Sequence, residues 1–391
     1  MTGVHNRKEQ MKILIVRTYP DILNLHSYNV QEIGLAKALT AKGNQCDIVL
    51  FGGKQKDHEE RFAFERQGRE YALTIYWLKG YSFLKNGIMP SVNKLIPHYD
   101  VIQVNEYDQL QSYWIYKKGK KPVVIYHGPY YHSYSRRYNF KCKIFDKLFL
   151  HGGFYKKIPV LTKSILAEEY LIQKGFQNVK TVGVGLDEGN FEMPVCSERL
   201  ANDIQKEEVF RVLYVGKIED RRNVYFLMEV FRRLHQKKPD TQLTIIGSGE
   251  EQYVKNFLAS IETELETGSV KYLPGATQLQ LVDVYKNTDL FLFTSNYEIF
   301  GMVLLEAMYF RVPVISSVNG GSVTLIEQGK NGYVLNEFNV EQWLEKTEEL
   351  MRDKGKWTKM GYMAERTIKE KYLWDILADR FLSAYQEALG L

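Results

Sequence analysis

The feature that most limits the fold of this chain is an alternation of short apolar segments with segments of helical periodicity. Lys12–Val16 (KILIV) and Arg211–Val215 (RVLYV) each run into a polar loop, and a helical segment follows at Val30–Ala41 and at Val224–Gln236. Strands that are apolar along their whole length and alternate with helices are typical of parallel sheets covered on both faces. The pattern therefore predicts an α/β fold with two doubly wound, Rossmann-like domains that face a cleft.

The same pattern continues through both halves of the 391-residue chain, a length that suits two domains of ordinary size. We expect further strands at Asp47–Phe51, Val101–Val104, Pro122–Tyr126, Val160–Thr162, Gln242–Ile246, Val270–Leu273, Leu290–Thr294 and Val312–Ser316. We place an N-terminal domain at residues 1–190, a C-terminal domain at 191–371 and an amphipathic helix at 372–391. Ligands of such folds bind where the strands end, so the loops after the strands are expected to hold the functional residues.

Composition excludes several classes of protein. With 45% hydrophobic and 25% charged residues, the chain is typical of a soluble globular protein. Cys46, Cys142 and Cys196 are too scattered for a disulfide framework or a metal-ligand spacing, which favours a reducing cytosol. The N-terminus is polar, and no apolar run reaches the ~20 residues of a membrane-spanning helix. We therefore expect a cytoplasmic protein.

The charge of the chain is unevenly distributed. Residues 1–190 contain 28 Lys/Arg and 17 Asp/Glu, whereas residues 191–391 contain 24 and 30. Residues 126–157 hold seven basic residues against one acid, Asp146, with ten aromatics between them. This segment suits an anionic membrane surface or a lipid-diphosphate acceptor, and the alternative is a solvated basic face over an aromatic core. No nucleic-acid-binding module is recognised, so nucleic acid is not an expected partner.

The strongest local signal follows the strand expected at Leu290–Thr294. The next loop carries Glu298, and Gly301 opens a helix. The first amides of a helix have no intrahelical partner, so those of Gly301, Met302 and Val303 are predicted to bind an anion such as a diphosphate.

Two carboxylates flank this predicted anion site. Glu306 lies in the helix among apolar neighbours, where an unpaired carboxylate is costly. Phosphates repel a carboxylate, so its expected partner is a pair of hydroxyls such as those of a ribose, and Glu298 is expected to accept from hydroxyls of a neighbouring sugar. The alternative is an ordinary buried helix with one solvated Glu.

A second signal is the loop Gly216–Asn223 (GKIEDRRN). Gly216 permits a sharp turn after the strand, and Lys217 and Arg222 can reach over the strand ends. Two cations beside a helix N-terminus suit a leaving diphosphate, because they stabilise its developing charge. The alternative for both is a solvated surface charge.

A third signal is His127, which ends another expected strand and precedes Gly128, so its ring is predicted to point into the cleft. The alternative is a histidine satisfied by the backbone at the edge of the core. Gly247–Gly249 (GSG) and Pro274–Gly275 also follow strands, and we expect them to let the backbone approach a flat base.

Together these motifs resemble the retaining, nucleotide-sugar-dependent glycosyltransferases of family 4, which have the GT-B fold. The resemblance is densest over residues 210–335, and it includes the spacing Glu298-x7-Glu306 and the pair Gly216–Lys217 with Arg222. Other matching positions are Phe300–Gly301, Pro313–Val314, Gly320–Gly321 and Asn331–Gly332. In that fold the C-terminal helix crosses back onto the first domain.

The resemblance implies a role for each motif. Glu298 would bind hydroxyls of the donor sugar, Glu306 would bind the ribose, and the two cations of the Gly216 loop would hold the diphosphate. His127 would contact the transferred sugar, and Gly275 would lie near the base. Family members generally need no metal, because cationic side chains replace it. Retention is usually explained by front-face substitution, in which the leaving phosphate takes the acceptor proton.

Two positions depart from the family pattern. The first loop is commonly rich in glycine, but here it reads NLHSYNV, with Ser27 and Tyr28 where glycines are expected. Ser27 can still donate from its backbone and its hydroxyl. Thr324 stands where the family usually has a Glu. Both departures bear on the identity of the donor rather than on the fold.

Two other chemistries are disfavoured. Glu106-Tyr107-Asp108 faintly resembles the acidic pair of metal-dependent glycosyltransferases, but it lies in the wrong domain, and a solvated or acceptor-facing loop is expected there. The first strand is not followed by GxGxxG, which disfavours a nicotinamide dehydrogenase.

On this resemblance we expect a metal-independent, retaining glycosyltransferase without a cofactor, which uses a nucleoside-diphosphate sugar, UDP being favoured over GDP. Its acceptor would be a hydroxyl of a glycan or of a lipid-linked acceptor in bacterial cell-envelope polysaccharide synthesis, at the inner face of the cell membrane. One alternative, motivated by the altered first loop and Thr324, is a catalytically weak relative that acts as a scaffold or accessory subunit. Another is a nucleotide-sugar epimerase of the same architecture, which needs no acceptor.

Overall fold

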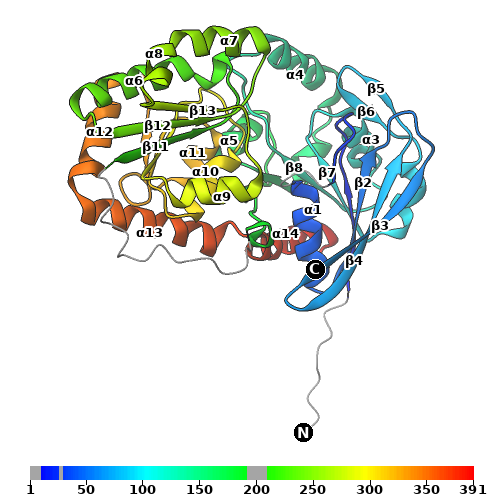
Figure 1. Cartoon of the computed structure of the whole chain (residues 1–391). Coiled ribbons are helices and arrows are strands. Elements are labelled where there is room, and N and C mark those ends of the chain that lie inside the picture. Colours follow the sequence, from blue (N-terminus) through cyan, green and yellow to red (C-terminus); the bar gives the residue numbers. More distant parts are fainter. Residues whose placement is uncertain (1–9, 26–29, 192–208) are drawn as a thin grey trace.

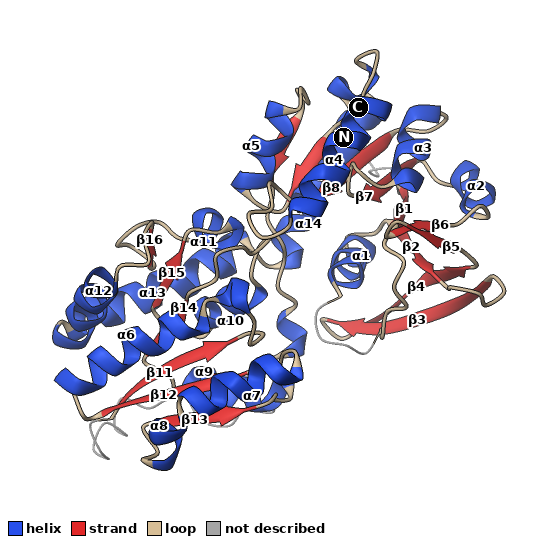
Figure 2. Cartoon of the chain, turned by 90° about the horizontal axis from the view of Figure 1, so that it is seen from above, coloured by secondary structure: helices blue, strands red, loops and turns tan. Residues whose placement is uncertain are grey.

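The computed structural model describes residues 10–25, 30–191 and 209–391. They form two α/β domains, and the chain passes from the first to the second and returns to the first with its last helix (Figure 1). Seen from above, each domain has its own sheet with helices packed beside it (Figure 2). The predicted boundary at residue 190 adjoins residues outside the described ranges, so it stays a prediction.

The N-terminal domain contains an eight-stranded sheet with the order β10-β9-β8-β7-β1-β2-β4-β3. All neighbouring strands are parallel except the edge pair β3–β4, which is antiparallel. The strands are β1 (Lys12–Val16), β2 (Gln45–Phe51), β3 (His58–Arg66), β4 (Arg69–Leu78), β7 (Val101–Asn105), β8 (Val123–His127), β9 (Val160–Thr162) and β10 (Val179–Thr181). A separate hairpin is formed by β5 (Tyr81–Phe83) and β6 (Asn86–Ile88).

Side chains alternate across this sheet and build two cores. Ile13 and Ile15 share one core with Leu35 of α1, whereas Leu14 and Val16 belong to the core beneath α2 to α5. This alternation is why a strand that is apolar along its whole length fits here. The helices are α1 (Gln31–Ala41), α2 (Val92–Leu95), α3 (Leu110–Lys118), α4 (Arg136–Phe149) and α5 (Ile165–Gln173).

The C-terminal domain contains a six-stranded parallel sheet with the order β13-β12-β11-β14-β15-β16. Its strands are β11 (Phe210–Val215), β12 (Thr241–Ile246), β13 (Val270–Leu273), β14 (Leu290–Phe293), β15 (Val314–Ser317) and β16 (Tyr333–Leu335). Its helices are α6 (Val224–Lys237), α7 (Glu251–Ser260), α8 (Glu262–Glu266), α9 (Gln278–Lys286), α10 (Met302–Tyr309), α11 (Gly320–Leu325), α12 (Val340–Arg352) and α13 (Lys354–Lys371).

The last helix, α14 (Trp374–Leu389), lies beneath α1 of the first domain (Figure 1). Tyr385 Oη donates to Gln103 Oε1 over 2.6 Å, so the helix is bonded to β7. Its indole at Trp374 fills space that only glycine leaves free, because a Cβ at Gly34 or Gly185 would lie within 2.5 Å of that ring. The expected return of the C-terminal helix to the first domain is therefore confirmed.

The prediction of two doubly wound domains is confirmed, and each apolar segment expected as a strand is one. The antiparallel edge was missed, because His58–Arg66 mixes charged and apolar residues and is largely exposed, unlike the buried parallel strands. Within the described residues, no helix is long and apolar enough to span a membrane.

Candidate functional site

Two loops that follow neighbouring strands meet at the carboxyl edge of the second sheet. The Gly216–Asn223 loop follows β11, and a loop from Thr294 to Gly301 follows the adjacent strand β14. Thr294 Oγ1 donates to the Arg222 carbonyl over 2.9 Å, and the Asn296 amide donates to the Arg221 carbonyl over 2.9 Å. These bonds hold the two loops together as one surface.

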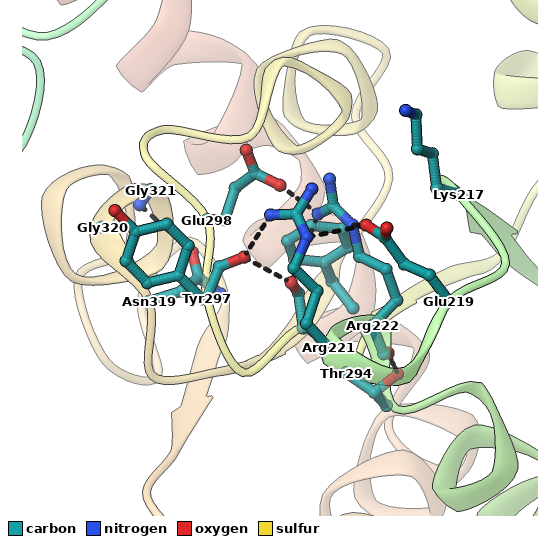
Figure 3. Close-up of polar contacts among 12 residues, drawn as sticks. Lys217, Glu219, Arg221, Arg222, Thr294, Tyr297, Glu298, Asn319, Gly320 and Gly321 are labelled. Atoms are coloured by element: carbon teal, nitrogen blue, oxygen red, sulfur yellow. Dashed lines mark hydrogen bonds and ion pairs between the residues drawn. The ribbon is translucent and has the colours of Figure 1, made fainter. Parts of the chain in front are cut away.

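Arg222 and Glu298 are directly paired across this surface (Figure 3). The guanidinium Nη1 of Arg222 donates to Glu298 Oε2 and, over 3.2 Å, to Ser295 Oγ. The two charged side chains are only 11% and 18% exposed. The structure thus brings together the predicted diphosphate cation and the predicted sugar-binding carboxylate.

One N–H group of Arg222 makes no hydrogen bond with the described residues. This group, Nε, is buried and lies 3.6 Å from Glu219 Oε1. A buried guanidinium N–H without a hydrogen bond is costly, and an anionic oxygen is its natural acceptor.

Arg221 is a site-region residue that the sequence did not single out. Its Nε donates to Glu219 Oε1 over 2.7 Å, and its Nη1 donates to the Tyr297 carbonyl over 3.1 Å. It therefore links the loop after β11 to the residue that precedes Glu298. The two adjacent arginines have the same charge. Only the backbone geometry therefore distinguishes Arg221, which bonds the Tyr297 carbonyl, from Arg222, which pairs with Glu298.

Lys217 does not join this cluster. Its side chain is exposed and points away from Glu298 (Figure 3), while its carbonyl accepts from Tyr214 Oη over 2.9 Å. Gly216 is explained by packing: a Cβ there would lie 2.9 Å from Tyr214 Oη. The glycines of the GSG loop are explained in the same way. A Cβ on Gly247 would overlap the Gly216 carbonyl, and one on Gly249 would overlap the Ile218 carbonyl.

The start of α10 lies next to Glu298. Gly301 caps the helix with a φ of 78°, a left-handed conformation that favours glycine, and a Cβ there would lie 3.2 Å from Glu298 Cγ. Met302 and Val303, the first two helical residues, are half-buried. Phe300 is 2% exposed and packs against Tyr372, so it is a core residue.

The two other residues predicted to contact the nucleotide, Glu306 and Gly275, differ in burial. Glu306 is 2% exposed, and its Oε2 accepts from Tyr285 Oη over 2.9 Å. Gly275 is exposed, and a Cβ there would meet no atom within 4 Å. Their predicted contacts with ribose and base stay predictions, as does that of Ser27, which lies outside the described residues.

His127 is fully buried at the end of β8 in the first domain. Its Nδ1 lies 2.6 Å from Glu106 Oε2, and the Gly128 amide donates to the same oxygen over 3.0 Å. Burial by itself raises the pKa of Glu106, but Lys163, His127 and the Gly128 amide together lower it to about 2. Glu106 is 19% exposed and lines a pocket, so the expectation of a solvated or acceptor-facing loop stays a prediction.

Two carboxylates and a histidine form a cluster here that can in principle bind a metal. Glu106, Asp108 and His127 each place one ligand atom within 4.8 Å of the others. Each carboxylate, however, already has a cationic partner: Lys163 lies 3.6 Å from Glu106, and Lys141 lies 3.2 Å from Asp108. These lysines compensate the negative charge that a divalent cation needs.

A charged pocket of about 290 Å³ lies beside Glu106 in the first domain. Its polar lining includes Arg17, Glu32, Asn105, Glu106, Gln109 and Lys163. Asn105 Nδ2 donates to Glu32 Oε1 over 2.5 Å, and Arg17 Nε lies 3.6 Å from the same oxygen. The sequence pointed only to parts of this lining, at Glu106 and in the first loop, because the pocket residues come from four separate segments.

The segment after His127 contacts the second domain at Glu298. Tyr130 Oη donates to the Glu298 carbonyl over 3.0 Å and accepts from the Gly320 amide over 3.1 Å. The ring of His132 stacks on Tyr297 with centroids 3.8 Å apart. Burial raises the pKa of Tyr130 to about 12, so its hydroxyl keeps its proton at neutral pH. The loop that holds Glu298 is thus fixed by both domains.

Comparison with known proteins agrees with this architecture. Residues 198–367 match the model of the family "Glycosyl transferases group 1". An uncharacterized glycosyltransferase of Methanocaldococcus jannaschii is 22% identical over 375 residues, which cover 92% of this chain and 93% of that protein. Spore coat protein SA of Bacillus subtilis is 26% identical over 183 residues, and the match spans only 48% of its length.

Solved structures share the whole fold. HepE of Anabaena in complex with UDP superposes with a TM-score of 0.71 at 16% identity, over 96% of this chain and 100% of that chain. Sucrose-phosphate synthase of Thermosynechococcus elongatus gives a TM-score of 0.70 at 16% identity, over 97% and 99% of the two chains. This chain therefore has the GT-B fold, and residues 198–367 within it are similar to the group 1 glycosyltransferases.

Proposed function

We propose that this protein is a retaining glycosyltransferase that moves a sugar from a nucleoside-diphosphate sugar to a hydroxyl acceptor. The observation that supports this most directly is the pairing of Arg222 with Glu298 beside the first turn of α10. A cation and free helical amides suit the diphosphate, and a carboxylate next to them suits sugar hydroxyls.

The chain's own residues account for the steps of this transfer. Arg222 stabilises the charge that develops on the leaving diphosphate. Glu298 releases Arg222 and accepts from hydroxyls of the donor sugar. With cationic side chains at the diphosphate, no metal is needed, and front-face substitution with the phosphate as proton acceptor gives retention.

UDP is the favoured nucleotide. Similar folds have been solved with UDP, with UDP-glucose and with UDP-2-fluoro glucose, in HepE and in a trehalose-6-phosphate protein of E. coli. A starch synthase of the same fold was solved with ADP, so ADP is the competitor to include in a test. We assign Glu306 to the ribose and Gly275 to the base, with Lys217 as a second contact of the diphosphate.

The acceptor site is proposed to be the charged pocket of the first domain. Carboxylates, amides and a lysine line it, and such groups recognise hydroxyls rather than an apolar body. Among similar proteins is the capsular polysaccharide biosynthesis glycosyltransferase CapM of Staphylococcus aureus, 24% identical over 245 residues that cover 60% of each chain. We therefore propose a glycan or lipid-linked acceptor of the cell envelope, used in the cytoplasm at the inner face of the membrane.

Thermal unfolding with UDP, GDP, ADP, CMP and their sugar conjugates tests the proposal first. A ligand at ~100 times its Kd stabilises the folded state by about 2.7 kcal/mol, so we expect a clear shift with UDP and its conjugates. Loss of the shift in Arg222→Ala, but not in Arg311→Ala just beyond the C-terminal end of α10, would assign the nucleotide to this site. No shift with any nucleotide favours a scaffold or accessory subunit instead. Turnover of the donor without an acceptor favours an epimerase.

A further inference from the structure

Helix α4 presents an apolar stripe to the outside of the first domain. Phe140, Ile144 and Leu148 are spaced one turn apart, and their side chains are 64%, 43% and 58% exposed. Residues four apart lie on one side of a helix, so the three form a continuous strip. The opposite side of the helix is already anchored in the core by Cys142 and Phe145. The strip is therefore not needed for the packing of α4 against the domain.

Basic residues flank this strip. Arg136, Arg137, Lys143 and Lys147 are exposed, and within the described residues none of the four makes an ion pair. The single acid of the helix, Asp146, points inward, where it pairs with Lys174 and accepts from Tyr107 Oη over 3.0 Å. The outer face of α4 is thus apolar in the middle and only positive at its edges.

The β5–β6 hairpin adds a second exposed apolar element. Tyr81, Phe83 and Leu84 are 62%, 57% and 70% exposed. Leu84 has a φ of 48° and Lys85 a φ of 61°, a left-handed turn in which glycine or asparagine is far less strained than leucine. A strained, exposed leucine gains nothing from the fold.

This hairpin tip is held rigidly. Asn86 Nδ2 donates to the carbonyls of Phe83 and Leu84 over 3.1 and 3.0 Å, and its Oδ1 accepts from the Leu110 amide over 2.9 Å. The tip is therefore fixed to the start of α3 and presents its apolar side chains outward. Both α4 and the hairpin lie at the upper end of the first domain in Figure 1.

We propose that the outer face of α4 and the tip of the β5–β6 hairpin dock this protein on an anionic lipid surface. Apolar side chains enter the boundary between headgroups and acyl chains, and the flanking lysines and arginines contact the anionic headgroups. Residues 1–190 carry 28 basic and 17 acidic residues, whereas residues 191–391 carry 24 and 30, so the field orients the first domain toward the lipid. This proposal rests on the proposed function in one respect, which is that the acceptor is linked to a lipid of the same membrane.

The test is flotation of the full chain with vesicles of phosphatidylcholine alone and of phosphatidylcholine with an equal share of phosphatidylglycerol. We expect the protein to float with the anionic vesicles and to stay in solution with the neutral ones. Replacing Phe140, Ile144 and Leu148 with Ser should lower the bound-to-free ratio at least about tenfold. Lys143→Glu with Lys147→Glu should lower it by a similar factor, and added salt should weaken wild-type binding.

Matched controls lie on the second domain. Leu279→Ser with Tyr362→Ser replaces side chains that are 54% and 53% exposed, and Lys271→Glu with Lys286→Glu makes the same change of charge. Both controls should float like wild type. UDP binding in solution, measured on every variant, reports folding and the donor site separately from docking.

Two results would overturn the proposal. One is a wild-type protein that binds UDP but remains in solution with anionic vesicles. The other is a strip that mediates self-association, seen as a wild-type dimer that the triple Ser variant converts to a monomer without any change in flotation.

Discussion

Arg222 and Glu298 neutralise one another across the two loops that follow β11 and β14, with both side chains largely buried. Arg222 is held by further contacts: it donates to Ser295 Oγ over 3.2 Å, and its guanidinium lies 5.7 Å from the centroid of the Phe293 ring. A donor must therefore exchange this ion pair for contacts of its own. The pair makes two largely buried charges compatible with the fold.

Removing one partner of this pair should cost more than removing both. Arg222→Ala leaves Glu298 as a partly buried charge, so the free energy of unfolding should fall by about 2–3 kcal/mol, and nucleotide binding should weaken. The double variant with Glu298→Gln should recover part of the stability but not the binding. Urea unfolding of the four proteins in a double-mutant cycle measures the coupling. Strictly additive effects would contradict the pairing.

Glu298→Ala should separate binding from transfer. In the proposed function its carboxylate contacts the donor sugar, whereas Arg222 and the first turn of α10 hold the nucleotide. UDP should still raise the melting temperature, while sugar transfer should fall by at least about a hundredfold, because the contact acts on the reacting sugar. Transfer at the normal rate would show that the sugar subsite lies elsewhere.

The pairing of Arg222 with Glu298 could be anticipated from sequence, whereas the surroundings of His127 could not. β11 and β14 are adjacent parallel strands, so loops after them must meet at one edge of the sheet, and buried apolar strands are visible in a sequence. Glu106, which follows β7, depends instead on a left-handed backbone with a φ of 60°, and on Lys163, which follows β9 on the other side of β8. No sequence pattern in either segment predicts that Lys163 and Glu106 lie next to each other.

Glu106 should make the free energy of unfolding depend on pH in the acid range. The pKa of its carboxyl is about 2 in the folded chain against an ordinary 4.5, because Lys163 and His127 outweigh the effect of burial. Its folded pKa is depressed, so its contribution is complete above about pH 4.5 and is lost as pH falls toward 2. Glu106→Gln should be less stable than wild type at pH 7, and the difference should shrink over that window. A constant difference from pH 7 to pH 2 would contradict the assigned ion pairing.

Tyr130 should couple the two domains through its hydroxyl. Tyr130→Phe leaves the Glu298 carbonyl and the Gly320 amide without this partner, so the free energy of unfolding should fall by about 1–2 kcal/mol. Tyr297→Phe is the matched control, because its hydroxyl lies 3.5 Å from the Tyr130 carbonyl and loses only a weak bond. Nucleotide affinity should fall in the first variant and not in the second. Equal effects would show that ring packing, rather than the hydroxyl, joins the domains.

Replacement by alanine should strongly destabilise the protein at one glycine of the second domain and leave its stability almost unchanged at another. A Cβ on Gly321 would lie 1.5 Å from the Phe300 carbonyl, so Gly321→Ala must displace the loop that holds Glu298 from α11. We expect a loss of more than about 2 kcal/mol in the free energy of unfolding, together with loss of transfer. Gly275→Ala meets open space, so its stability should stay within about 0.5 kcal/mol of wild type. Any weakening of UDP binding in that variant then reports contact with the base, and unchanged binding would remove Gly275 from the proposed nucleotide site.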